Sequence, residues 1–82
     1  MTQDQVFEKV IGILKPFSKD PDALAAAKME TNILKDLKVN SARLVDVVLE
    51  MEDTFGIEIA DNEADQVRTV GDAVTLIVRR KA

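Results

Sequence analysis

The sequence predicts an all-α fold, a small antiparallel bundle of three longer helices and one or two short ones, formed by a single domain over residues 1–82. Three segments carry apolar residues at intervals of three and four, the period of a helix that buries one face. Residues typical of helix starts and ends separate these segments, and no strand is needed. With 82 residues, 46% of them hydrophobic, the chain can bury one modest core.

The first helix is expected from about Gln3 to Phe17, because Pro16 should end it. Its broad apolar face is formed by two neighbouring rows: Val6, Val10, Ile13 and Phe17, with Phe7, Ile11 and Leu14 beside them. A short second helix is expected after Asp20, which is a good N-cap, with Pro21 in the first helical position.

The strongest periodic signal lies between Ser41 and Phe55. The apolar stripe of this helix consists of Leu44, Val47, Val48, Met51 and Phe55. Gly56 is expected to end it in the left-handed conformation. After a short extended link, Asp61 is expected to cap another brief helix that runs through about Gln66.

The last helix is expected to open at Thr69, with Asp72 three residues later in a variant of the capping box. Four residues should face inward: Val70, Ala73, Val74 and Ile77. Its last residues include three cations, Arg79, Arg80 and Lys81, which suit the negative end of a helix dipole.

Composition restricts the function. The chain has no Cys and no His, so thiolate nucleophiles, imidazole bases and zinc sites built from these residues are excluded, and we expect no enzyme and no metal site. The acids of residues 53–65 also miss the alternating ligand positions of a calcium loop. No apolar run approaches membrane length, and the start lacks the pattern of a secretory signal. We therefore expect a cytoplasmic protein, and we separately expect it to be a monomer.

Charge is distributed unevenly around a net charge of −4. Between Leu44 and Val67 there are eight acids and no Lys or Arg. This segment would repel nucleic acid and attract a basic partner protein. An ordinary solvated surface is the alternative explanation.

Ser41 stands where the central helix begins. Asn40 and Ser41 are both good N-caps, so the hydroxyl could simply satisfy free backbone amides. A helix start also favours a phosphate group, because free N–H groups and the positive end of the dipole face it. The same helix carries a second, narrower apolar stripe of Ala42, Val45 and Leu49, bordered by Asp46, Glu50, Glu52 and Asp53. An apolar centre with a charged rim is typical of a docking surface.

Residues 33–77, ILKDLKVNSARLVDVVLEMEDTFGIEIADNEADQVRTVGDAVTLI, resemble the acyl carrier proteins. The family pattern around the modified serine is D-L-G-x-D-S-L. Asp36 and Leu37 match its start, and Ser41 matches the serine that receives 4′-phosphopantetheine. The acidic recognition positions of the family fall on Asp46, Glu52 and Asp53, and its structural positions on Phe55, Ile59, Asp61, Ala64, Thr69, Val70 and Ala73.

The resemblance implies a carrier of acyl or aminoacyl groups, held as thioesters on a covalent 4′-phosphopantetheine arm at Ser41. Its implied partners are a phosphopantetheinyl transferase and basic-surfaced acyl-transferring or condensing enzymes. The expected docking residues are Asn40, Ala42, Arg43, Val45, Asp46, Leu49, Glu50, Glu52 and Asp53. The expected lining of an acyl pocket, which is ordinary core at the same time, is Val47, Val48, Met51, Ile57, Ile59, Ala64 and Val67.

The chain departs from the family pattern next to the serine. Asn40 replaces the usual Asp, Ala42 the usual Leu and Lys38 the usual Gly, and Arg43 adds a second cation. These departures favour a specialised lipid or secondary-metabolite pathway over bulk fatty-acid synthesis. The alternative is a carrier-like helical adaptor that binds basic partners and is never modified.

Overall fold

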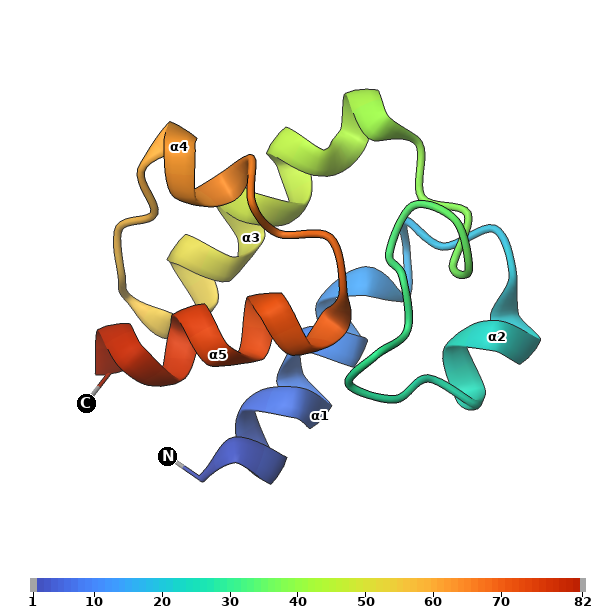
Figure 1. Ribbon diagram of the computed structural model, residues 1–82, viewed down its shortest axis with the longest axis horizontal. Helices are drawn as coiled ribbons and strands as arrows, with labels where there is room; N and C mark the ends of the chain where they lie inside the picture. The colour runs from blue at the N-terminus through green and yellow to red at the C-terminus, as the bar shows by residue number, and fades with distance from the viewer. Residues whose placement is uncertain (1, 82) are drawn as a thin grey trace.

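The computed structural model describes residues 2–81, which form five α-helices and one short 3₁₀ helix (Figure 1). The helices are α1 (Gln3–Leu14), α2 (Pro21–Ala25), η1 (Ser41–Arg43), α3 (Leu44–Phe55), α4 (Asp61–Ala64) and α5 (Val70–Lys81). The all-α prediction is confirmed, with α1, α3 and α5 as the three longer helices. Within residues 2–81 there is no strand, only an isolated bridge between Asn32 and Thr69.

The three longer helices enclose the core. α5 packs along α1, and α1 runs in the opposite direction to α3 and α5 (Figure 1). The predicted inward residues of α5 are all buried, as are those of α3 except Leu44, which is half-buried. From α1 the buried residues are Val6, Val10 and Leu14.

The end of α1 differs from the prediction. The helix ends at Leu14, whose carbonyl accepts hydrogen bonds from the N–H groups of both Phe17 and Ser18 in a closing turn. Phe17, expected in the core stripe, therefore lies beyond the helix and is only half-buried, and Ile13, which lies within the helix, is half-buried as well. At the other end, Thr2 and Gln5 form a capping box that sequence reasoning missed.

Three of the predicted helix caps are present in the structure. Asp20 Oδ1 accepts from Ala23 N–H at 3.0 Å, and Gly56 is left-handed at φ 64°, so both predictions are confirmed. The capping box at the start of α5 is confirmed, because the Thr69 hydroxyl accepts from Asp72 N–H and the Asp72 carboxylate accepts from Thr69 N–H.

The predicted cap of α4 is wrong. Asp61 is the first helical residue of α4, and Ala60 occupies the N-cap position. Alanine offers no side-chain acceptor, and the Glu63 carboxylate accepts from the Ala60 N–H at 3.2 Å. α4 ends at Ala64, before the expected Gln66.

The connection between α2 and η1 contributes to the core, which the helical patterns did not predict. Ile33, Leu37 and Val39 are buried in it. The connection is fixed to the start of α5, where Gly71 N–H donates to the Met29 carbonyl at 2.7 Å. A Cβ at Gly71 would lie 2.8 Å from that oxygen, so this close approach requires glycine.

The cations at the end of α5 bind neighbouring helices. Arg80 contacts the Glu63 carboxylate of α4, and Lys81 Nζ donates to the Phe55 carbonyl at the end of α3, at 3.0 Å. They lie in the last turn, as suits the dipole of α5, and also join that turn to α3 and α4. No helix within residues 2–81 has the length and apolar character needed to cross a membrane.

Candidate functional site

Ser41 is the first residue of the 3₁₀ helix that leads into α3, and it is exposed. The cap at this point is Asn40, whose Oδ1 accepts a hydrogen bond from Ala42 N–H at 2.9 Å. The Ser41 hydroxyl makes no hydrogen bond with any other residue between 2 and 81. Of the two explanations for this serine, capping therefore falls to Asn40, and the Ser41 oxygen remains accessible for chemistry.

A hollow of about 230 Å³ lies beside Ser41, between α3 and α4. We call it the front hollow; Ser41 is one of its lining residues, with Leu44, Val45, Val48, Leu49, Glu52, Ile59, Asp61, Ala64 and Asp65. Its walls combine apolar side chains from α3 and the link before α4 with carboxylates at its rim. An acyl chain attached near Ser41 could lie against these apolar side chains.

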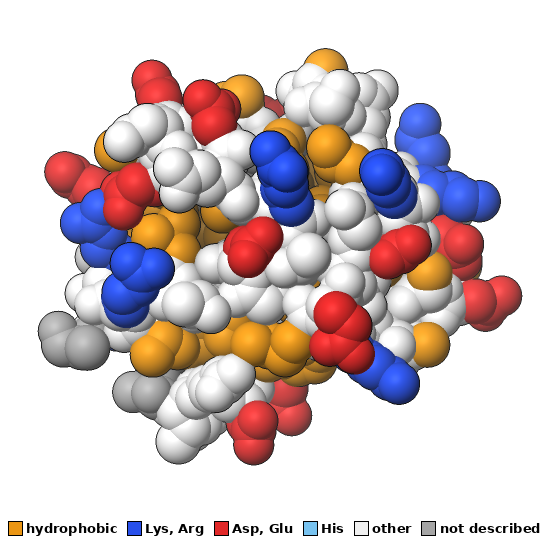
Figure 2. All heavy atoms as spheres, in the orientation of Figure 1, with side chains coloured by type: hydrophobic (Ala, Val, Ile, Leu, Met, Phe, Trp, Pro, Cys, Tyr) orange, Lys and Arg blue, Asp and Glu red, His pale blue; other side chains and the backbone are white. Residues whose placement is uncertain are grey.

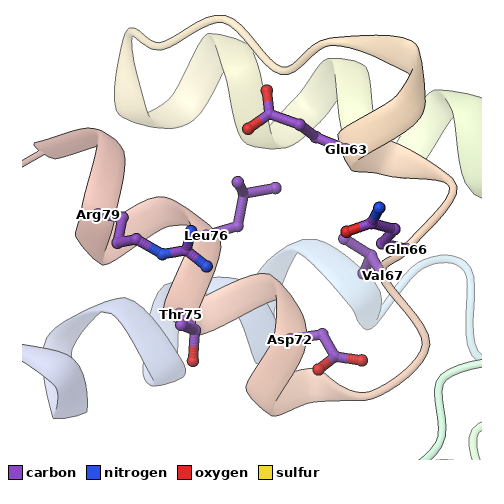
Figure 3. Close-up of a pocket in the computed structure, with 7 residues that line it drawn as sticks. All are labelled: Glu63, Gln66, Val67, Asp72, Thr75, Leu76 and Arg79. Atoms are coloured by element: carbon purple, nitrogen blue, oxygen red, sulfur yellow. The ribbon is translucent and has the colours of Figure 1, made fainter.

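Only part of the expected acyl lining surrounds the front hollow. Val48, Ile59 and Ala64 line it, whereas Val47 and Met51 are buried elsewhere in the core. Val67 lines a different hollow on the other side of α4, between α4 and α5 (Figure 3), and Ile57 is half-buried in the link. Leu44, which was not among the expected lining residues, also lines the front hollow, and its spacing of four residues from Val48 places both on one face.

The outward face of α3 carries the second apolar stripe. Val45 and Leu49 are 66% and 56% exposed, and Ala42 is exposed beside them. Of the acids expected at the border of this stripe, Glu50 and Asp53 are exposed and Asp46 is half-buried. This face therefore presents apolar and acidic groups together to solvent.

Glu52 was expected to border the stripe on the exposed face, but it does not lie there. It is half-buried, and its Oε2 accepts a hydrogen bond from Ile59 N–H at 2.9 Å. The reason is its position on the side of α3 that faces α4. Glu52 joins α3 to the link before α4.

Arg43 is held by two contacts within the chain. Its Cζ lies 5.2 Å from the centroid of the Phe17 ring, and its Nε lies 3.4 Å from Asp46 Oδ2. The guanidinium charge is thus partly satisfied by the ring face and by the carboxylate. Beside Ser41, the acidic surface of α3 therefore contains one paired cation.

Lys38 adopts a left-handed backbone conformation with φ 55°. The family pattern has glycine at this position, and glycine adopts such a conformation without steric cost. The Lys38 Nζ lies 3.9 Å from Asp20 Oδ2, in a largely exposed ion pair. The turn before Ser41 thus keeps a glycine-type backbone in spite of the lysine.

Two carboxylates near α4 and α5 have pKa values below their usual range. The pKa of Glu63 is lowered by the hydrogen bond from the Ala60 backbone and then by Arg80. For Asp72, partial burial opposes the change, but hydrogen bonds from Arg68 N–H, Thr69 N–H and the Thr69 hydroxyl outweigh it and lower the pKa. Both groups are ionised at neutral pH.

These features define a class of protein: a small helical protein that presents an exposed serine at the start of an acidic helix. A family model described as a phosphopantetheine attachment site matches residues 6–77. The chain is 38% identical over 78 residues to an acyl carrier protein of Lactobacillus acidophilus, with 94% of each chain covered. It is 35% identical over 79 residues to a mitochondrial acyl carrier protein of Saccharomyces cerevisiae, covering 94% of this chain and 63% of that one.

Comparison with solved structures points to the same family. A solved acyl carrier protein from Enterococcus faecalis matches with a TM-score of 0.79 at 36% identity, covering 98% of this chain and 99% of that chain. The chain belongs to the acyl carrier protein family. Its cofactor is accordingly 4′-phosphopantetheine, and it is a carrier rather than a catalyst. The exposed, unbonded Ser41 hydroxyl beside the front hollow fits this group.

Proposed function

We propose that Ser41 carries the 4′-phosphopantetheine arm and that the protein delivers acyl or aminoacyl groups, bound as thioesters, to partner enzymes. The observation that supports this assignment is the contrast between the two serines of the chain. Ser41 is exposed and makes no hydrogen bond within residues 2–81, whereas the Ser18 hydroxyl donates to the Leu37 carbonyl at 2.7 Å. Of the two serines, only Ser41 therefore has a hydroxyl at a helix start that is unengaged among the described residues.

When bound, the arm supplies a reactive thiol, which a chain without Cys cannot supply itself. The residues around Ser41 favour its phosphate in two ways. Asn40 caps the turn and leaves the Ser41 oxygen accessible. The first N–H groups of α3 and the positive end of its dipole stabilise negative charge at this point. The apolar walls of the front hollow, formed in part by Leu44 and Val48, shield a cargo chain from water.

The partners are a phosphopantetheinyl transferase and acyl-handling enzymes with basic rims. Their docking surface is the outward face of α3, with the stripe Ala42, Val45 and Leu49 at its centre. Among the acids of this face, Glu50 and Asp53 are exposed and have no ion pair within residues 2–81. Charge complementarity would steer a basic partner to this helix and fix its orientation.

The residues beside Ser41 also support a specialised lipid or secondary-metabolite pathway. Asn40 lacks the carboxylate of the family pattern, Ala42 lacks the apolar anchor, and Arg43 brings a cation already paired with Asp46. A transferase that recognises these three residues would be a different enzyme from the transferase that serves bulk fatty-acid synthesis.

Mass spectrometry of the protein from its native cells tests the proposal. We expect the intact mass to exceed that of the bare chain by one phosphopantetheine group, and peptide mapping to place the group on Ser41. Ser41→Ala should remove the modification and leave the free energy of unfolding within about 0.5 kcal/mol, because Asn40 still caps the turn. A bare chain in cells that contain the partner enzymes would instead support the unmodified adaptor, and a group on Ser18 or a threonine would refute the assignment.

A further inference from the structure

The short helix α4 stands between two hollows. On one side lies the front hollow, of about 230 Å³, which includes Asp61 and Ala64 of α4 in its lining. On the other side lies a hollow of about 190 Å³ between α4 and α5, which we call the back hollow. In Figure 3 the Leu76 side chain points from α5 across this hollow towards Glu63 of α4. α4 is therefore a wall of the front hollow with unfilled space behind it.

Within the described part of the chain, one side-chain ion pair links α4 to α5. Arg80 contacts Glu63, whose carboxylate also accepts the hydrogen bond from Ala60 N–H that caps α4. The next residue, Lys81, donates to the Phe55 carbonyl and so fixes the end of α5 to the end of α3. α3 and α4, the two walls of the front hollow, are thus connected through the last turn of α5.

Electrostatics predicts the direction in which α4 would move if this link were lost. Three carboxylates, Glu52, Glu58 and Glu63, line a third hollow at the start of α4, and Arg80 is the one cation among the described residues that line it. Figure 2 shows acidic side chains crowded around α4, with the cations of the α5 end beside them. Without Arg80, repulsion between Glu52 and Glu63 would drive α4 away from α3 and into the back hollow.

We propose that Arg80 is a positioning residue for the cargo: by holding Glu63 it fixes α4 and limits the length of acyl chain that the front hollow admits. The inference rests on the proposed function, because it assumes a cargo chain beside Ser41. One methylene group takes up about as much volume as one water molecule in the liquid, about 30 Å³. The front hollow, of about 230 Å³, therefore has room for roughly eight carbon atoms of a chain. Displacement of α4 into the back hollow would add room for up to about six more.

The test places chains of known length at position 41 without any transferase. Because the protein has no Cys, S41C introduces a single thiol, which straight-chain alkyl methanethiosulfonates convert to an alkyl disulfide. The thermal midpoint of each conjugate is then measured as the alkyl chain lengthens. Each methylene that enters the front hollow should raise the midpoint by up to roughly 3–6 °C, and the rise should stop at the length limit, near eight carbons.

Two variants in the S41C background weaken the ion pair in different ways. Arg80→Gln removes the cation and leaves the three carboxylates, so we expect the length limit to increase by several carbons and the α4 amides to exchange roughly two- to fivefold faster. Glu63→Gln keeps an oxygen for the Ala60 cap but removes both attraction and repulsion. Its length limit should lie between those of the parent and Arg80→Gln.

Arg79→Gln is the matched control, because Arg79 lines the back hollow but has no ion pair within residues 2–81. Its length limit should equal that of the parent. Leu76→Phe enlarges the side chain that points into the back hollow, so adding it to Arg80→Gln should return the limit to the parent value.

An unchanged length limit and unchanged α4 exchange in Arg80→Gln would overturn the inference, as would an equal shift in Arg79→Gln. Failure here is distinguishable from failure of the proposed function. The alkyl chains are attached chemically, so their length limit can be measured whether or not a transferase modifies Ser41. Conversely, a modified Ser41 in native cells would stand even if Arg80 proved irrelevant.

Discussion

The backbone N–H of Ile59 donates a 2.9 Å hydrogen bond to Oε2 of Glu52, across seven residues of sequence. This bond joins the side of α3 to the link that precedes α4. It gives Glu52 a structural contact that the exposed acids of the same helix, Glu50 and Asp53, do not make within residues 2–81. The acids of α3 are therefore not interchangeable.

The first prediction follows from this difference. Glu52→Ala should lower the free energy of unfolding by about 1–2 kcal/mol, because the Ile59 N–H loses its partner in a half-buried place. Asp53→Ala, on the exposed face, should change it by no more than about 0.5 kcal/mol. Urea denaturation of both variants measures the difference. Equal losses would mean that the hydrogen bond contributes nothing, and Glu52→Gln, which keeps an acceptor, should lose less than Glu52→Ala.

The second prediction concerns docking. Asp46→Lys should slow loading by the transferase roughly tenfold at low ionic strength, because it reverses a charge on the outward face and also breaks the pair with Arg43. Glu8→Lys makes the same change of net charge on an exposed position of α1 and should leave the rate unchanged. Loading rates are measured as salt shortens the Debye length from about 10 Å to about 3 Å. Wild-type rates that do not fall with salt would exclude electrostatic steering by this face.

The third prediction concerns the residues beside Ser41. A broad-specificity transferase should load the wild type poorly, and Asn40→Asp combined with Ala42→Leu should raise the rate by on the order of a hundredfold. An aspartate keeps the acceptor that caps Ala42 N–H, and position 42 is exposed, so the double variant should remain folded. The measurement is kcat/KM with circular dichroism as the folding control. Identical rates would remove the main support for a specialised pathway.

The fourth prediction concerns Lys38. Lys38→Gly should raise the free energy of unfolding by about 0.5–1 kcal/mol, because relief of the left-handed conformation exceeds the added entropy of the unfolded chain. The exposed ion pair with Asp20 that is lost contributes little. Lys38→Ala loses the same pair but keeps the backbone penalty, so it should show no gain. Thermal denaturation that places both variants at the same midpoint would contradict this explanation.

The sequence by itself determined the features that depend on neighbouring residues. The period of apolar residues located α3 and α5 and their buried faces, and the cap residues Asp20, Gly56 and Thr69 were assigned correctly. These features follow from backbone hydrogen bonding within a few residues. The gap-free match of residues 33–77 to the family pattern likewise pointed to Ser41.

Only the tertiary structure decided which side chains meet across the fold. The expected acyl lining divided into Val48, Ile59 and Ala64 beside Ser41 and other residues deep in the core or behind α4. Arg80 contacts Glu63 on another helix, and Glu52 accepts a hydrogen bond from the link before α4 instead of lying fully in solvent. Periodicity shows which face of a helix is apolar but carries no information about which neighbouring element covers it. The positions of the hollows around α4 therefore follow from packing, not from local pattern.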